Sequence, residues 1–250
     1  MTALLEVEGL TRRFGGVVAA DHLDFAVAPG ELLGLIGPNG AGKTTVLRLI
    51  AGLIRPEAGR IRLGGVEIGG EPTHRRVRRG LGLTHQLVRP FRGLTVAENV
   101  MLAAGHRHTR HPLAALARLS RARERRTAEA ILVRVGLADL ADRPPAVLPL
   151  GARKRLELAR ALALEPTVLL LDEPMAGLSS AEAAALGDTV SALARAGTAV
   201  VLVEHNLGEV VRLARRLLVL DAGRAIAEGP PDVVMRDPAV RLAYVGTGDE

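Results

Sequence analysis

The chain of 250 residues contains no cysteine, no tryptophan, one tyrosine and three phenylalanines. Without cysteine it can form no disulfide, no thiolate metal site and no cysteine nucleophile. Its few aromatic side chains leave almost nothing on which single-stranded bases could stack. The net charge of +6 therefore does not by itself indicate nucleic-acid binding, and we expect no nucleic-acid partner.

Long apolar runs are missing as well. Although 48% of the residues are apolar, no stretch approaches the roughly 18 uninterrupted apolar residues typical of a membrane-spanning helix. The first 16 residues lack the basic-then-apolar order of a signal peptide. These features predict a protein made and kept in the cytoplasm, with enough apolar residues for one large domain.

Lysine is scarce: apart from Lys43 and Lys154, every member of the 33 basic residues is arginine. Arginine is therefore the default cation of this chain, and each lysine is more informative than usual. An insert from Glu98 to Gly136 is rich in Ala, Leu and Arg, and predicts helices with a solvated basic face. Its histidines have no acidic or thiol partner at ligand spacing, so we expect surface residues rather than metal ligands. These histidines are His106, His108 and His111.

Two kinds of apolar pattern alternate with helical segments along the chain. Residues 4–14 and 21–31 alternate with period two and predict antiparallel strands. Residues 32–37, 167–174 and 198–205 are nearly continuous apolar runs, typical of parallel strands covered on both faces. Each run ends in a polar or glycine-rich group, and ligands of open α/β sheets bind at the carboxyl ends of strands. The pattern predicts an α/β fold with one shared site.

The strongest motif is GPNGAGKTT, which fits G-x-x-x-x-G-K-S/T and lies between an apolar run and a segment with helical spacing. In such a loop the glycines let backbone N–H groups wrap phosphate oxygens. Lys43 is expected to reach the β- and γ-phosphates, and Thr44 to offer its hydroxyl to Mg²⁺. The predicted phosphate-loop residues are Gly37, Pro38, Asn39, Gly40, Ala41, Gly42, Lys43, Thr44 and Thr45.

Two acids and a histidine end the other apolar runs. Asp172 and Glu173 would be costly to bury without a cation, so a metal is their natural partner. We expect Asp172 to hold the Mg²⁺ shell and Glu173 to polarise the attacking water as general base. An apolar run followed by two acids is a weak signal alone, and the phosphate loop strengthens it. A histidine such as His205 is usually a structural hydrogen-bonder, but here we expect it to contact the γ-phosphate and fix the attacking water.

With these motifs in this order, the chain resembles the ATP-binding subunit of ABC transporters over nearly its whole length. The resemblance implies a phosphate-loop α/β ATPase that binds ATP and Mg²⁺, with a mainly parallel core sheet. It also implies an N-terminal antiparallel β-subdomain at residues 1–31 and about 60–72. A helical signature subdomain is expected at about 88–160, and a C-terminal tail at 229–250.

The resemblance assigns roles to individual residues. Phe14 matches the aromatic residue that stacks on adenine, and Gln86 matches the glutamine loop that touches Mg²⁺ and faces the membrane subunit. Asp172 and Glu173 match the magnesium and catalytic acids, and His205 matches the switch histidine. Residues 176–179 match the dimer-contact loop. The implied metal ligands are Thr44, Gln86 and Asp172, and the implied catalytic residues are Lys43, Glu173 and His205.

The signature position, where the common family form is L-S-G-G-Q, reads LPLGA in this chain. Its residues are Leu148, Pro149, Leu150, Gly151 and Ala152. Pro149 replaces the serine whose hydroxyl would bond the partner's γ-phosphate, an interaction of roughly 1.5 to 3 kcal/mol. Gly151 and a helix N-terminus remain, with a helix expected from about Ala152 to Leu164. Similar subunits of amino-acid importers often replace that serine, which favours a variant half-site.

Finer features resemble the larger ATPase of branched-chain amino-acid importers, notably the insert and the tail from Gly229 to Gly246. This implies a second ABC ATPase subunit, in a heterodimer or alternatively a homodimer, with two transmembrane permease subunits and an external binding protein. The chain would be peripheral on the inner face of the cell membrane. Importers for urea or amides remain an alternative, because they use very similar ATPases.

Two other classes of function can be weighed against that of a transport ATPase. A soluble ABC ATPase in translation or DNA repair usually carries two ATPase halves or a long coiled-coil insert, and this sequence has neither. A binding module that uses ATP only as a structural ligand would be expected to lose Glu173 or His205, and both are present. The sequence therefore favours a hydrolysing transport subunit.

Overall fold

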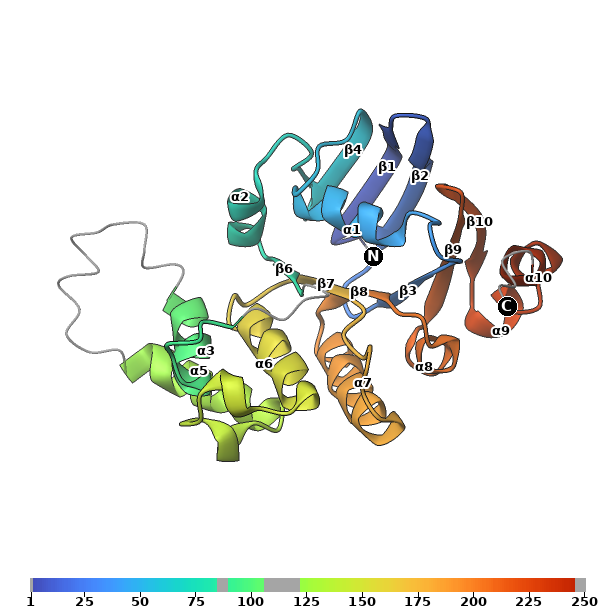
Figure 1. Cartoon of the computed structure of the whole chain (residues 1–250). Coiled ribbons are helices and arrows are strands. Elements are labelled where there is room, and N and C mark those ends of the chain that lie inside the picture. The colour runs from blue at the N-terminus through green and yellow to red at the C-terminus, as the bar shows by residue number, and fades with distance from the viewer. Residues whose placement is uncertain (1, 85–89, 106–121, 246–250) are drawn as a thin grey trace.

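The computed structural model describes residues 2–84, 90–105 and 122–245 (Figure 1). Gln86 and the three histidines of the insert lie outside these residues, so their predicted roles are not addressed by the structure. The described residues form an antiparallel sheet, a mainly parallel core sheet and helices on both faces of that core sheet. The predicted fold class, α/β with an antiparallel β-subdomain and a helical insert, is confirmed.

The antiparallel sheet has the strand order β2-β1-β4-β5. Its strands are β1 (Leu5–Phe14), β2 (Val17–Val27), β4 (Ala58–Leu63) and β5 (Val66–Glu67). Leu5 pairs with Val27 on one side and with Leu63 on the other, and all three side chains are buried. The alternating apolar residues of these strands thus supply one inward face, as the period-two pattern predicts.

The core sheet has six strands in the order β10-β9-β3-β8-β7-β6. Its strands are β3 (Leu32–Ile36), β6 (Leu81–Leu83), β7 (Val168–Asp172), β8 (Ala199–Val203), β9 (Arg216–Asp221) and β10 (Arg224–Gly229). The pairs β6–β7, β7–β8, β8–β3 and β3–β9 are parallel, and of the strands described in this sheet only β10 runs antiparallel to its neighbour. Every residue of β3, β7 and β8 is buried, as expected for parallel strands covered on both faces.

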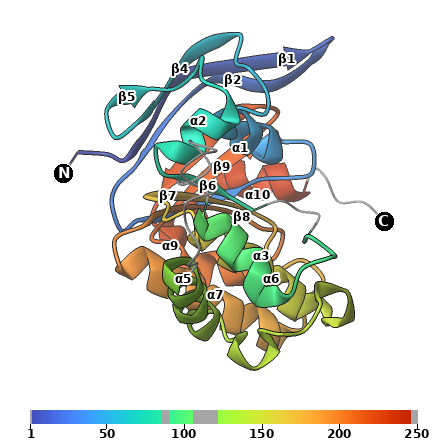
Figure 2. The same ribbon diagram turned by 90° about the vertical axis from the view of Figure 1, so that its left-hand side faces the viewer.

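Two apolar clusters cover the two faces of this sheet. Leu33 and Leu35 of β3 belong to the cluster that also contains α1 (Lys43–Ala51) and the antiparallel sheet. Leu32 and Ile36 belong to the opposite cluster, with α6 (Leu150–Leu162), α7 (Ser180–Arg195) and α8 (Leu207–Leu213). Figures 1 and 2 show the antiparallel sheet and α1 on one side of the core strands, and α6 and α7 on the other.

The remaining helices lie at the two ends of the core sheet. They are α2 (Thr73–Arg78), α3 (Val96–Ala104), α5 (Ala122–Arg134), α9 (Pro231–Val234) and α10 (Pro238–Val245). Helices α3 and α5 pack with α6 at the β6 end, whereas α9 and α10 contact β10 at the other (Figure 1). None of the described helices is both long and apolar enough to span a membrane.

A buried arginine fixes the end of α1. Arg76 is 1% exposed, and its guanidinium donates to the carbonyl oxygens of Leu49 and Ile50 at 2.7 and 2.8 Å. It also donates to the carbonyl oxygens of Gly69 and Glu71, each at 2.8 Å. Burial lowers the pKa of Arg76, opposed by nearby acidic side chains. The cation binds carbonyl oxygens of the last turn of α1, one of which, that of Leu49, also accepts the N–H of Gly52 at 3.1 Å, and so holds the helix that begins at the phosphate loop.

Candidate functional site

The loop between β3 and α1 needs glycine for steric reasons. Gly37, Gly40 and Gly42 have φ of 148°, 80° and 104°. A Cβ on Gly42 would collide with the backbone of Ala19, and one on Gly37 with the backbone of Leu220. Gly42 caps α1 without any side-chain hydrogen bond, so the first-turn N–H groups of α1 are offered to a ligand rather than to a capping side chain. A glycine cradle that ends in an uncapped helix N-terminus fits a phosphate group.

The lysine of the loop is a buried cation. Lys43 is 6% exposed, and its Nζ donates to the carbonyl oxygens of Gly37 and Pro38 at 2.7 and 2.8 Å. Burial lowers the pKa of Lys43, while the charges of Glu173 and Asp172 act to raise it. A cation held against the loop and next to two acids is placed to meet negative phosphate oxygens.

Two of the three predicted metal ligands, Thr44 and Asp172, lie together. Thr44 Oγ1 donates to Asp172 Oδ1 at 3.1 Å, although the residues are 128 positions apart. Thr44 stands in the first turn of α1, and Asp172 is the last residue of β7. A hydroxyl and a carboxylate are hard oxygen donors that suit Mg²⁺. No group of three or more His, Cys, Asp and Glu residues at metal-binding distance occurs within the described parts of the chain.

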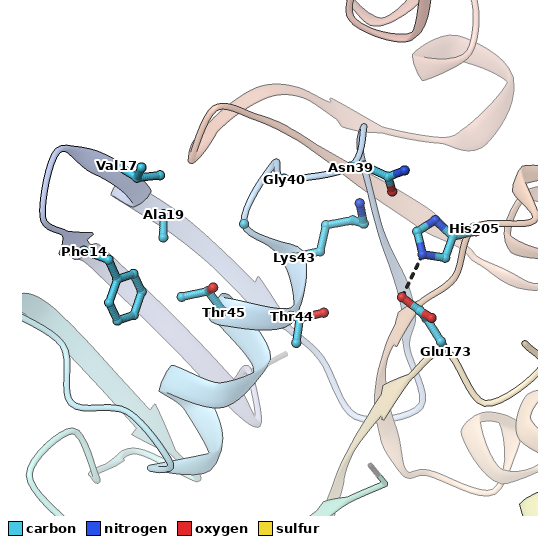
Figure 3. Close-up of a pocket in the computed structure, with 11 residues that line it drawn as sticks. Phe14, Val17, Ala19, Asn39, Gly40, Lys43, Thr44, Thr45, Glu173 and His205 are labelled. Carbon is cyan, nitrogen blue, oxygen red and sulfur yellow. Dashed lines mark hydrogen bonds and ion pairs between the residues drawn. The ribbon is translucent and has the colours of Figure 1, made fainter. Parts of the chain in front are cut away.

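The predicted general base and the histidine also meet. His205 Nε2 lies 2.7 Å from Glu173 Oε1, and Figure 3 shows the two side chains pointing toward one another. Glu173 is 8% exposed and has a φ of 50°, an uncommon backbone conformation for a residue with a side chain. Its N–H donates to the carbonyl oxygen of Val203 at 2.9 Å. The strained turn directs the carboxylate to the edge where the phosphate loop lies.

A cavity of about 350 Å³ joins these parts. Phe14, at the end of β1, lines one side of it, and Glu173 and His205 line the other (Figure 3). Phe14 is 43% exposed, and the guanidinium of Arg12 lies 4.7 Å from the centre of its ring. The loop residues that line the cavity are Asn39, Gly40, Gly42, Lys43, Thr44 and Thr45. The loop residues Pro38 and Ala41 are buried and do not line the cavity.

The signature segment lies elsewhere. None of residues 148–152 lines this cavity. Leu148 and Ala152 are buried core residues, Pro149 and Leu150 are exposed, and a Cβ on Gly151 would collide with the Glu182 carboxylate. Helix α6 begins at Leu150, two residues earlier than expected, because Pro149 occupies the N-cap with φ −62° and ψ 162° and provides no side-chain cap. The helix also ends two residues earlier than expected, at Leu162.

Three residues that the sequence did not mark as functional contact the site residues. Lys154 of α6 donates to the carbonyl oxygen of Glu173 at 2.9 Å, and only its rarity drew notice in the sequence. Glu204 is 4% exposed and accepts the N–H of Met175 at 2.5 Å. Burial raises the pKa of Glu204.

The third is Tyr244 of α10, the one tyrosine of the chain. Burial raises the pKa of its hydroxyl, and a hydrogen bond from the backbone N–H of Gly37 opposes this rise. The C-terminal helix therefore touches the first glycine of the phosphate loop. Nothing in the local sequence around Tyr244 indicates this contact, which arises from the packing of α10 beside β10.

Two family models match the chain. Residues 20–176 match the model described as ABC transporter. Residues 226–250 match the model described as branched-chain amino acid ATP-binding cassette transporter. The first match contains the phosphate loop and both acids, and the second contains the C-terminal helix.

Similar proteins and structures extend over the whole chain. It is 38% identical over 250 residues to the high-affinity branched-chain amino acid transport ATP-binding protein BraF of Pseudomonas aeruginosa, covering 97% of this chain and 98% of BraF. It is 36% identical, with the same coverage, to the corresponding protein LivG of Escherichia coli. The solved structure of MJ1267, an ATP-binding cassette of an ABC transporter, superposes with a TM-score of 0.86 at 27% identity, covering 98% of this chain and 99% of that one.

Proposed function

The chain belongs to the ABC transporter family of ATP-binding proteins and is an ATPase, and on this premise we propose that it powers an importer of branched-chain or related amino acids. The observation that carries the substrate class is the match of residues 226–250 to the branched-chain amino acid model. Similarity to BraF and LivG over nearly the whole chain supports this substrate class, because both are named as branched-chain amino acid transport proteins.

In the proposed site each residue has a role that its position supports. Lys43 and the backbone N–H groups of the loop bind the phosphates of ATP, and Phe14 stacks on adenine. The Glu173 carboxylate accepts a proton from the water that attacks the γ-phosphate, and His205 orients that water. Oxygens of Thr44 and Asp172, with Gln86 as the third expected ligand, would hold Mg²⁺, which would supply positive charge to the phosphates.

The position of the signature segment supports the proposed assembly. Because none of residues 148–152 lines the chain's own cavity, and Pro149 and Leu150 are exposed, the segment can face a nucleotide bound to a second ABC ATPase subunit. Two such subunits would close head to tail on two ATP molecules and move two permease subunits through the region around Gln86. An external protein would deliver the amino acid, and this chain would lie in the cytoplasm against the inner face of the membrane.

The test is to copurify the chain with candidate permease subunits and a second ABC ATPase from the same cells, and to reconstitute the complex in vesicles. ATP hydrolysis should rise when the binding protein carries leucine, isoleucine or valine. Stimulation by urea or amides instead would overturn the substrate class. An ATPase that never associates with membrane subunits would overturn the transport role.

A further inference from the structure

Lys154 connects the two functional parts of this chain. It lies on α6, which begins at Leu150. Lys154 is roughly one helical turn, or about 6 Å along the axis, beyond that first residue. The residue is 7% exposed, and its Nζ donates to the carbonyl oxygen of Glu173 at 2.9 Å. A buried cation on the signature helix thus holds the backbone of the proposed catalytic glutamate.

The backbone around Glu173 needs such support. Its φ of 50° costs conformational energy and persists only where neighbouring contacts hold it. The N–H of Glu173 is fixed by Val203, and its carbonyl oxygen accepts from Lys154 and, at 3.3 Å, from the N–H of Ala176. Of these, only the Lys154 contact comes from the signature helix; the others come from the neighbouring strand and from the turn itself.

The chemistry favours lysine at this position. The ammonium group is a compact point charge that can aim one donor at a single carbonyl, whereas a guanidinium is a planar fork suited to several acceptors. The charge of Lys154 also acts on the buried Glu204 carboxylate, which binds the N–H of Met175 two residues after Glu173. One cation therefore binds the Glu173 carbonyl directly and also acts, through its charge, on the carboxylate that holds Met175.

We propose that Lys154 is a positioning residue that couples the signature segment to Glu173, so that occupation of the partner's nucleotide site sets the geometry of this chain's own catalytic base. The proposal rests on the proposed ATPase assembly. A shift of α6 when residues 148–152 meet the partner's nucleotide moves Nζ, because Lys154 lies only about one turn from the helix start. The Glu173 carbonyl follows, and with it the carboxylate that faces His205.

The test uses the complete transporter with the partner ATPase carrying a Glu-to-Gln change at its own catalytic acid, so that only this chain turns over. Lys154→Met keeps the length of the side chain but removes the donor. It should lower kcat by about 10- to 100-fold, the factor expected for losing one hydrogen bond from a charged donor. The KM for ATP should stay within about twofold, because the loop contacts are intact.

Matched variants separate positioning from a purely structural role. Lys154→Arg retains a charged donor but presents it on a planar fork, so it should recover part of kcat relative to Lys154→Met. The exposed neighbour change Arg153→Met should leave kcat and KM unchanged. If Lys154→Met does not fold, Lys154→Leu, which also lacks a donor, carries the same expectation. An unchanged kcat, or an equal loss in the Met and Arg variants, would overturn the proposal.

A second measurement addresses the coupling itself. Replacing the phosphate-loop lysine of the partner empties its nucleotide site and should slow hydrolysis at this chain's site. In Lys154→Met this dependence should disappear; a dependence as large as that of the parent complex would contradict the coupling. A parent complex with no ATPase activity would count against the proposed function instead, so the two failures can be told apart.

Discussion

The phosphate loop and the signature segment are both motifs at helix N-termini, but they differ in where their ligand lies. The loop before α1 has its cavity, its acids and its histidine within the same chain. The segment at the start of α6 does not line that cavity and departs from the common form at several positions. A motif that binds its ligand within its own chain is complete in one subunit, whereas a motif that serves a partner's site is complete only in the assembly.

The same difference appears in how the two helices begin. Gly42 leaves the start of α1 uncapped beside Lys43, a buried cation. Pro149 also leaves α6 without a side-chain cap, but next to it stands Leu150, an apolar side chain that is 40% exposed. Phosphate at α6 would therefore meet backbone N–H groups and the helix dipole, with no hydroxyl from this segment.

The largest effect should come from the chain's own site. Glu173→Gln keeps the shape of the side chain but cannot accept the proton of the attacking water, so kcat should fall roughly 10²- to 10⁴-fold. ATP should still bind, as measured with a fluorescent analogue. The exposed control Glu129→Gln should leave both quantities unchanged, and undiminished hydrolysis by Glu173→Gln would refute the general-base role.

The support of the loop helix can be broken separately. Arg76→Met leaves four carbonyl oxygens without their cationic donor, and should lower the free energy of unfolding by about 2 to 4 kcal/mol. Urea denaturation of the isolated subunit measures this loss. Arg75→Met, at an exposed neighbouring position, should cost less than about 0.5 kcal/mol; equal losses in both variants would show that the buried contacts are unimportant.

The signature departure should make the two ATP sites unequal. Because Pro149 offers no hydroxyl, the partner's site should hydrolyse ATP about 10- to 100-fold more slowly than this chain's site. Single-site Glu-to-Gln variants of each subunit in a heterodimer measure the two rates.

Pro149→Ser sharpens the same comparison. The serine adds a hydroxyl at the N-cap of α6 and should accelerate the partner's site about tenfold, with a smaller change at this chain's own site. Equal rates at the two sites before the change, or no response to it, would contradict the half-site interpretation.

The smallest effect is a difference in how stability depends on pH near Glu173 and near the signature segment. Burial raises the pKa of Glu204 from 4.5, so the folded chain holds its proton longer and stability falls as pH rises through that window. Hydrogen bonds from Ser179 lower the pKa of Glu182, beside the signature segment, so its stabilising contribution is present above pH 4.5 and is lost as pH falls through the lower folded pKa.

Glutamine variants at the two positions should therefore change the pH dependence in opposite directions. Glu204→Gln should remove a slope of at most about 1.4 kcal/mol per pH unit, and Glu182→Gln a slope of the other sign. Urea titrations across mildly acidic pH measure both. Slopes of the same sign would contradict the opposite pKa shifts of Glu204 and Glu182.

Much of the fold follows from the sequence pattern because it depends on local rules. The continuous apolar runs correspond to β3, β7 and β8, and the alternating segments to β1 and β2. The start of α6 was misplaced by two residues, since the spacing of apolar residues does not show that a proline can serve as N-cap. The role of Gln86 stays a prediction.

The sequence by itself determined the phosphate loop, because its glycines, lysine and threonine act within nine consecutive residues and their requirements are short-range. Only the tertiary structure decided which distant groups meet there. Thr44 hydrogen-bonds Asp172 across 128 positions, and Glu173 meets His205 across 32. Lys154 reaches the Glu173 carbonyl from α6. These contacts depend on strand order and on the packing of α6 against the sheet, and no local pattern encodes the distance between strand ends.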